Sequence, residues 1–270
     1  MLLSHPGRIA PRRICRVQSK PLVMGPMKPR ILLIVHQQTS NPGRIGQMVA
    51  EFGCEAVICR HACGDPLPES LDDYAASIIF GGPMSANDDH LPAIRNELDW
   101  LEVPLRSDKP FLGICLGAQM LARYLGGTVS THAQGYHEIG FYKVTVRPDG
   151  RDLFDDAQYF YQWHSEGFTL PSGVEHLAAS ELFPNQAFRT GNAYGVQFHP
   201  DVTGEMMLRW SAKAAHRMVL PGAQARDLQH AGLAAHNDRI ESWSRRFFAH
   251  WLAPVLGQAA ATPMAMAASD

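Results

Sequence analysis

Short apolar runs alternate with segments of helical periodicity between residues 30 and 126, and this alternation restricts the possible folds more than any other feature. Residues 31–35 are wholly aliphatic, as in a strand that is covered on both faces. Three similar runs follow, at 56–59, 77–80 and 111–114. Helices are predicted to begin at Pro42, at Pro92 and at Leu116. The pattern favours an α/β fold, a doubly wound and mostly parallel sheet with helices on both faces.

The pattern changes after Gly127, where the predicted strands become shorter. Residues 141–147 alternate apolar and polar side chains, which predicts an antiparallel strand. Further short strands are predicted around 159–163, 176–179, 187–189 and 194–199, and helices at 206–218 and 228–252. We therefore expect one domain in which an antiparallel extension continues the parallel sheet. The Met, Trp and Phe residues of the last two helices fit packing on that sheet, with 245–251 as a candidate homodimer surface.

The composition excludes several classes of protein. Hydrophobic residues make up 46% and charged residues 19% of the chain, which is typical of a globular protein. The 24 basic and 26 acidic side chains nearly balance, so the charge predicts neither nucleic acid nor an anionic membrane as a partner. No apolar run approaches the ~20 residues that a membrane helix needs. The sequence thus predicts a globular protein with no membrane or nucleic-acid partner.

The five cysteines predict no disulfide framework, because their number is odd. Three of them, with His61, lie within residues 54–63 at a spacing unlike common zinc sites, which favours buried thiols over a metal. Reduced thiols are typical of a cytoplasmic enzyme. We therefore expect a cytoplasmic protein without a bound metal.

The chain begins with a basic segment that contains no acidic residue before Glu51. This leader resembles a transit peptide or a translated upstream extension, and it lacks the apolar core of a secretory signal. The other end, from Ala259, is rich in alanine. We expect three parts: a leader outside the core over 1–28, the folded domain over 29–255 and a flexible tail over 256–270.

The strongest local motif is Gly113-Ile114-Cys115-Leu116-Gly117, which falls between the fourth predicted strand and a helix. It has the form of a nucleophile elbow, with cysteine in place of serine. Such a sharp turn needs the flanking glycines and exposes the nucleophile at the carboxyl edge of the sheet. The start of the helix favours a thiolate, and the Leu116 N–H can stabilise an oxyanion. The alternative is a buried cysteine in a glycine-rich turn.

Two further motifs support the catalytic interpretation. His199 ends a predicted strand about 80 residues after the cysteine and is followed by Pro200 and Asp201. His199 could take the thiol proton, and Asp201 could hold the imidazole in its working tautomer. Gly81-Gly82-Pro83 follows the third predicted strand, where a backbone N–H could approach a ligand closely. Taken alone, His199 also fits an ordinary core or surface imidazole, and the glycine pair also fits an ordinary turn.

Together, the three motifs resemble those of class I glutamine amidotransferases, the triad type with a cysteine nucleophile. The chain looks most like the free-standing branch related to the amidotransferase domain of GMP synthetase, and the resemblance extends over about 30–251. It implies that cysteine attacks the side-chain amide of glutamine, releases ammonia and forms a γ-glutamyl thioester that water hydrolyses. It implies no metal or organic cofactor.

The resemblance also implies roles for individual residues. By matching position, Cys115 would be the nucleophile, His199 the general base and acid, and Asp201 the residue that orients His199. The N–H groups of Gly82 and Leu116 would form the oxyanion hole. The residues that would bind the substrate are Gln119, Gly117, His164 and Ser165. Asp201 departs from the family, whose third triad member is usually glutamate, one methylene longer.

Three functions remain open on the sequence. The first is a glutamine amidotransferase or glutaminase that supplies ammonia to a separate acceptor enzyme, because no synthetase domain or phosphate-binding loop is visible in the chain. The second is a γ-glutamyl peptidase or hydrolase that uses the same triad, since only the leaving group differs. The third is a non-catalytic binding protein, against which the intact Cys115, His199 and Asp201 argue.

Overall fold

The computed structural model describes residues 28–155 and 158–257. The expected leader and tail therefore lie outside the described residues, apart from Lys28, Leu256 and Gly257. The described part folds around one nine-stranded sheet with the strand order β2-β1-β3-β4-β11-β10-β9-β6-β7. A separate two-stranded sheet, formed by β5 (Val129–Thr131) and β8 (Glu166–Phe168), lies beside it. Sequence patterns had not indicated these two short strands.

Five neighbouring strands of the large sheet are parallel. They are β2 (Glu55–Cys59), β1 (Arg30–Ile34), β3 (Ala76–Ile79), β4 (Phe111–Ile114) and β11 (Ala193–Val196). Helices span two of the connections: α1 (Gly43–Glu51) lies between β1 and β2, and α2 (Pro92–Trp100) with α3 (Glu102–Arg106) lies between β3 and β4. The connection from β2 to β3 contains a short 3₁₀ turn, His61–Cys63. The carboxyl ends of these strands consequently lie along one edge of the sheet.

The other four strands form the antiparallel extension that the alternating sequence predicts. They are β10 (Ala187–Thr190), β9 (Glu175–Ala179), β6 (Glu138–Val146) and β7 (Gln158–His164). The prediction of a mostly parallel sheet with such an extension is confirmed. After β11 the chain continues into α5 (Gly204–Lys213), a 3₁₀ turn (Ala215–Val219) and the long helix α6 (Arg226–Leu256).

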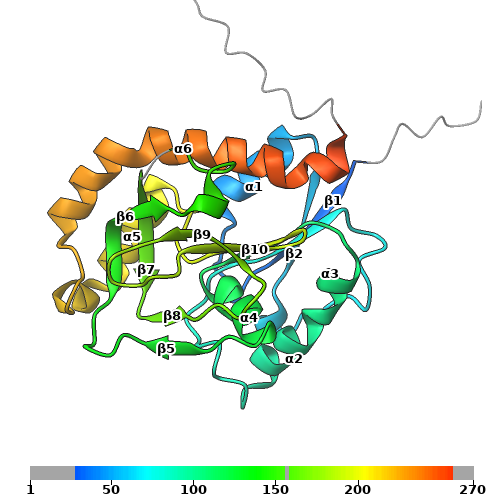
Figure 1. The fold of residues 1–270 in the computed structure, drawn as a ribbon, viewed down its shortest axis with the longest axis horizontal. Coiled ribbons are helices and arrows are strands. Elements are labelled where there is room, and N and C mark those ends of the chain that lie inside the picture. The colour runs from blue at the N-terminus through cyan, green and yellow to red at the C-terminus, as the bar shows by residue number, and fades with distance from the viewer. Residues whose placement is uncertain (1–27, 156–157, 258–270) are drawn as a thin grey trace, which may run out of the picture.

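Two apolar layers cover the sheet because successive side chains of a strand face opposite sides. In β1, Ile31 and Leu33 belong to the layer under α1 and α6, whereas Leu32 and Ile34 belong to the layer under α2 and α4 (Leu116–Tyr124). Figure 1 shows α1 and α6 on one side of the sheet and α2 and α4 on the other. The predicted helices on both faces are confirmed.

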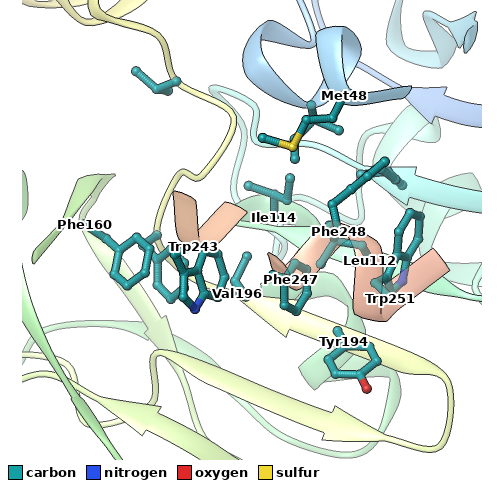
Figure 2. Close-up of a cluster of buried hydrophobic side chains, with 14 of the residues drawn as sticks. Met48, Leu112, Ile114, Phe160, Tyr194, Val196, Trp243, Phe247, Phe248 and Trp251 are labelled. Atoms are coloured by element: carbon teal, nitrogen blue, oxygen red, sulfur yellow. The ribbon is translucent and has the colours of Figure 1, made fainter. Parts of the chain in front are cut away.

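The large aromatic residues of α6 fill the first layer (Figure 2). Trp243, Phe247, Phe248 and Trp251 are all at most 3% exposed. Trp243 stacks on Phe154 with ring centroids 5.1 Å apart. The apolar side chains of 245–251 therefore pack on the sheet of their own chain, as the spacing predicts. Arg245 forms an ion pair with Glu51, and Arg246 with Asp155.

Two sequence-based expectations need correction. Residues 194–199 are not one strand, because β11 ends at Val196 and His199 lies three residues beyond it. The pairing of β11 with β4 ends at Val196, whose carbonyl oxygen accepts from the Cys115 N–H. Beyond it, the His199 N–H donates to Tyr161 O of β7. The cysteines of 54–63 are not all buried, since Cys63 is exposed while Cys54 and Cys59 are covered. No described helix has the length and apolar character needed to cross a membrane.

Candidate active site

Cys115 sits in the sharp turn that joins β4 to α4, as the elbow motif predicts. Its backbone has φ 52° and ψ −103°, in the positive-φ region that non-glycine residues rarely adopt. The flanking glycines make this turn possible, since a Cβ on Gly113 would lie 2.5 Å from the carbonyl carbon of Gly117. A Cβ on Gly117 would in turn collide with the Ile79 carbonyl of β3. Cys115 is 7% exposed and lines a cavity.

His199 and Asp201 follow β11, the parallel neighbour of β4, so both strands deliver their residues to the same edge of the sheet. The two residues are each 4% exposed. His199 Nδ1 lies 3.2 Å from Asp201 Oδ1, which leaves Nε2 as the free ring nitrogen. The indole of Trp210 on α5 packs edge-on against the imidazole at 5.3 Å. The carboxylate and the indole together fix the orientation of the ring.

Burial, Cys115 and Asp201 together determine the pKa of His199. Burial alone would lower the pKa of His199, but the negative charges of Cys115 and Asp201 outweigh it and raise the pKa to about 10. An imidazole in this position readily accepts and keeps a proton from the thiol. The arrangement is therefore suited to moving a proton between sulfur and the Nε2 nitrogen.

Gly81 and Gly82, just after β3, lie against the Cys115–His199 pair. A Cβ on Gly81 would sit 2.8 Å from His199 Cε1 and 3.4 Å from Cys115 Cβ. Gly82 and Leu116 line the same cavity as the thiol. Within the described residues, neither the Gly82 nor the Leu116 N–H donates to a protein acceptor in a turn, loop or cap. These two donors remain available to a ligand oxygen beside the sulfur.

Of the predicted substrate-binding residues, Gln119 lines the cavity and Gly117 does not. Gln119 is 4% exposed, and its Nε2 donates to Glu166 O at 2.9 Å and to Gln197 Oε1 at 3.1 Å. Gly117 faces the backbone of β3 instead, where only a residue without a side chain fits. The structure thus brings Gln119 to the site and gives Gly117 a packing position.

His164 and Ser165 also line the cavity, at the end of β7. The His164 Nδ1–H donates to Glu166 O at 2.9 Å, and Nε2 contacts Glu138 Oε2 at 3.0 Å. Glu138 is fully buried and also accepts from Ser180 Oγ at 2.6 Å and from Gln186 Nε2 at 2.8 Å. A buried polar network therefore positions this wall of the cavity.

The cavity holds about 660 Å³, within the roughly 300–1,000 Å³ of typical ligand pockets. Asp88 and Glu166 contribute acidic groups to its lining, and Arg209, Lys213 and Arg217 contribute basic ones. The half-buried Arg217 lies 5.7 Å from the Trp163 ring. Its guanidinium has no ion pair or hydrogen bond within the described part of the chain. No three His, Cys, Asp or Glu side chains in that part are grouped as a metal site would require.

Sequence reasoning assigned no role to several residues behind the site. Arg44, in the first turn of α1, is 6% exposed and donates from Nη1 to Pro200 O at 2.9 Å. Its backbone N–H donates to Asp201 O at 2.8 Å, so α1 holds the turn that carries the histidine. His36 and Glu97 form a second buried histidine–carboxylate pair. Two sequence signals could have identified them: Arg44 lies on the apolar face of a predicted helix, and His36 comes just after a predicted strand.

Comparison with known proteins gives a consistent result. The family model for glutamine amidotransferase class-I matches residues 33–209. One subunit of the glutamine-hydrolysing GMP synthase of Sulfurisphaera tokodaii is 37% identical over 139 residues, covering 50% of this chain and 71% of that protein. The glutamine-hydrolysing GMP synthase of Porphyromonas gingivalis is 39% identical over 142 residues, but the match covers 50% of this chain and only 26% of that longer protein.

Two crystal structures show the same architecture along nearly their whole length. A glutamine amidotransferase of Thermotoga maritima superposes with a TM-score of 0.74 at 28% identity, covering 83% of this chain and 98% of the other. A glutamine amidotransferase of Methylobacillus flagellatus gives a TM-score of 0.77 at 26% identity, covering 84% and 95%. The likeness therefore includes the antiparallel extension as well as the parallel core.

Proposed function

The chain belongs to the class-I glutamine amidotransferase family, and on this premise we propose that it hydrolyses the side-chain amide of L-glutamine with Cys115 as nucleophile. The observation that carries this proposal is the convergence of Cys115, the His199–Asp201 pair and two free backbone N–H groups on one cavity. The three parts come from three neighbouring parallel strands, β3, β4 and β11. They supply a nucleophile, a base and an oxyanion site, as amide cleavage needs.

In the first step, His199 Nε2 takes the thiol proton and the sulfur attacks the side-chain carbonyl carbon of glutamine. The carbonyl oxygen becomes an oxyanion, which the N–H groups of Gly82 and Leu116 stabilise. The protonated imidazole then donates its proton to the amide nitrogen, so that the C–N bond breaks and ammonia leaves. A γ-glutamyl thioester remains on Cys115.

In the second step, His199 takes a proton from water, which attacks the thioester carbon. The oxyanion forms again at the same two N–H groups. The C–S bond breaks, glutamate leaves, and the proton returns from the imidazole to the sulfur. Asp201 keeps Nδ1 protonated throughout and so reserves Nε2 for the transfer. Aspartate satisfies this geometry at 3.2 Å in the position where the family usually has glutamate.

The test is ammonia release from L-glutamine by the purified chain. We expect turnover that is lost in Cys115→Ser and kept in Cys63→Ser, since Cys63 is exposed and does not line the cavity. Turnover that survives Cys115→Ser would refute the proposal.

The ammonia acceptor is proposed to be a separate protein. The Sulfurisphaera tokodaii relative is named as one subunit of a glutamine-hydrolysing GMP synthase, and this chain matches only about a quarter of the longer synthase of Porphyromonas gingivalis. Adding a synthetase subunit that lacks its own amidotransferase should raise the rate of glutamine hydrolysis. An unchanged rate together with no nitrogen transfer would exclude that partner.

The size and charge of the cavity favour γ-glutamyl hydrolysis as a second candidate. The cavity continues past Cys115 along α5 and the 3₁₀ turn after it, where Lys213 and Arg217 offer cationic groups. A leaving group that carries a carboxylate, as in a γ-glutamyl peptide, could use these cations, whereas ammonia could not. Comparing kcat/KM for glutamine, γ-glutamylglycine and γ-glutamyl methylamide tests this, because only γ-glutamylglycine has a carboxylate on its leaving group. A clear preference for γ-glutamylglycine would select this candidate over the first.

A further inference from the structure

His36 and Glu97 form a fully buried pair directly behind the Gly81–Gly82 loop. Both side chains are 0% exposed, and His36 Nε2 lies 2.9 Å from Glu97 Oε2. His36 follows β1, whereas Glu97 projects from α2, so the pair joins the sheet to a covering helix. His36 does not line the cavity, although its neighbours Val35 and Gln37 do. The pair therefore lies behind the loop and cannot contact the substrate.

The other nitrogen of the same ring points at the loop. The His36 Nδ1–H donates to the Gly81 carbonyl oxygen at 3.1 Å. The ring also packs beneath the next residue, since a Cβ on Gly82 would lie 2.8 Å from His36 Cγ. Gly82 thus has room for a hydrogen only, and the peptide between the two glycines rests on the imidazole.

This contact determines where the Gly82 N–H points. The Gly81 carbonyl and the Gly82 N–H belong to one peptide group, which is trans, so they point in opposite directions. Because the carbonyl is turned toward the buried imidazole, the N–H is turned away from it, toward the side where Gly81 and Gly82 line the cavity. That N–H is the proposed oxyanion donor.

We propose that His36, held by Glu97, is a positioning residue that fixes the Gly82 N–H in the oxyanion hole. This inference rests on the proposed function, because it assigns a purpose to a donor of that reaction. Glu97 holds the ring on one side, and the Gly81 carbonyl lies on the other. The pair resembles His199–Asp201 in composition, but it acts on a peptide group instead of a thiol.

The protonation of the pair agrees with this role. Burial would lower the pKa of His36, but the hydrogen bond and charge of Glu97 and the bond to Gly81 together raise it. When the ring is protonated, both nitrogens carry hydrogens, and the bond to the Gly81 carbonyl is then made by a charged and therefore stronger donor. Glu97 Oε1 has no hydrogen-bond partner among the described residues. The buried carboxylate is therefore stabilised mainly by His36 at Oε2.

The decisive variant replaces the whole pair, His36→Phe with Glu97→Leu. A single change would leave a buried charge without its partner, whereas apolar replacement of a buried ion pair is often tolerated. The phenyl ring keeps much of the imidazole's volume under Gly82 but cannot donate to Gly81. The matched control is His176→Phe, because His176 also donates to a backbone carbonyl, that of Ala178, but lies in β9 away from the cavity.

Two measurements separate positioning from general damage. Steady-state glutamine hydrolysis reports kcat and KM, and alkylation of Cys115 by iodoacetamide reports the thiol and His199 without forming an oxyanion. We expect kcat to fall by about 10- to 100-fold, below the roughly 10²–10³-fold cost of deleting an oxyanion donor. KM and the alkylation rate should stay near the wild-type values.

Each contrary outcome has a distinct meaning. An active wild type with unchanged kcat in the double variant would overturn this inference and leave the proposed function intact. A parallel loss of kcat and alkylation would show that the pair is only structural, and would also overturn it. A wild-type chain without Cys115-dependent hydrolysis would refute the proposed function and this inference with it.

Discussion

The parallel and antiparallel halves of the sheet both build the cavity, but they hold its residues in different ways. At the ends of β3, β4 and β11, positions are set by the backbone: Cys115 has a positive φ, and glycines pack without room for a methyl group. At the ends of β6 and β7, positions are set by hydrogen bonds among buried side chains around Glu138.

The difference teaches which changes each half can tolerate. Backbone geometry cannot relax around an added atom, so small steric changes on the parallel side should affect the rate of the chemical step. A side-chain network can keep its shape after an isosteric change, so the antiparallel side should lose stability and substrate affinity before rate.

Asp201→Asn should have the largest effect, because it changes the proton transfer itself. We expect kcat to fall by roughly 10²–10⁴-fold, the upper value being that of a serine protease triad. The pKa of His199 should also fall, since one of the two negative charges that raise it is removed. Enzyme kinetics and an NMR titration of His199 check both effects. Asp72→Asn at an exposed position is the control, and equal activity of the two variants would contradict the proposed role.

Gly81→Ala should reduce kcat by about 10²-fold with little change in the free energy of unfolding. The new Cβ would lie 2.8 Å from His199 Cε1, so the imidazole must move away from the sulfur. A shift of about 1 Å at a reacting group can cost that much. Kinetics and urea denaturation measure the two quantities, with Gly46→Ala on α1 as the control. A wild-type kcat in Gly81→Ala would contradict the claim that tight backbone packing on the parallel side sets the rate of the chemical step.

Glu138→Gln should lower stability more than rate. Replacing the carboxylate puts an amide donor among Ser180, Gln186 and His164, at a cost of about 1–3 kcal/mol in the free energy of unfolding. We expect KM to rise because the 163–166 wall shifts, while kcat changes little. Urea denaturation and steady-state kinetics, with the exposed Glu181→Gln as control, provide the comparison. A kcat loss like that of Gly81→Ala, at unchanged KM, would contradict the account.

Arg217→Gln should have the smallest effect, and only on some substrates. The guanidinium is half-buried beside Trp163 and has no protein partner in the described chain. If it binds a leaving-group carboxylate, KM for γ-glutamylglycine should rise by about 10-fold, the value of one charge-assisted hydrogen bond. KM for γ-glutamyl methylamide should not change. In the control variant Arg226→Gln, KM should stay the same for both substrates. Equal effects on both substrates would exclude this role.

The sequence predicted the parallel half of the molecule well, because its signals are local. The predicted strand at 111–114 has the bounds of β4, and the glycine spacing around Cys115 encodes the elbow directly. The end of β11 was misplaced, since His199 is held by Tyr161 of β7, a contact that local alternation does not report. Gly117, expected to bind substrate, packs against β3 and does not line the cavity.

Contacts between distant residues could not be predicted. His36 and Glu97 are 61 residues apart, and Arg44 reaches Pro200 across 156 residues. Each is a polar residue in an apolar setting, and periodicity alone does not identify its partner. The Glu138 network likewise joins β6 and β7 with Ser180 and Gln186, which lie between β9 and β10. Such pairings depend on how the sheet brings its strand ends together, which becomes visible only in the folded chain.

The most direct test of the central claim is to trap the γ-glutamyl thioester. The chain is mixed with L-glutamine, quenched in acid within the first turnovers, digested and examined by mass spectrometry. We predict one γ-glutamyl unit on the peptide that contains Cys115, and none on that peptide in Cys115→Ala. Glutamine turnover in a Cys115→Ala chain, or a γ-glutamyl unit on Cys63 instead, would contradict the assignment of Cys115 as the nucleophile.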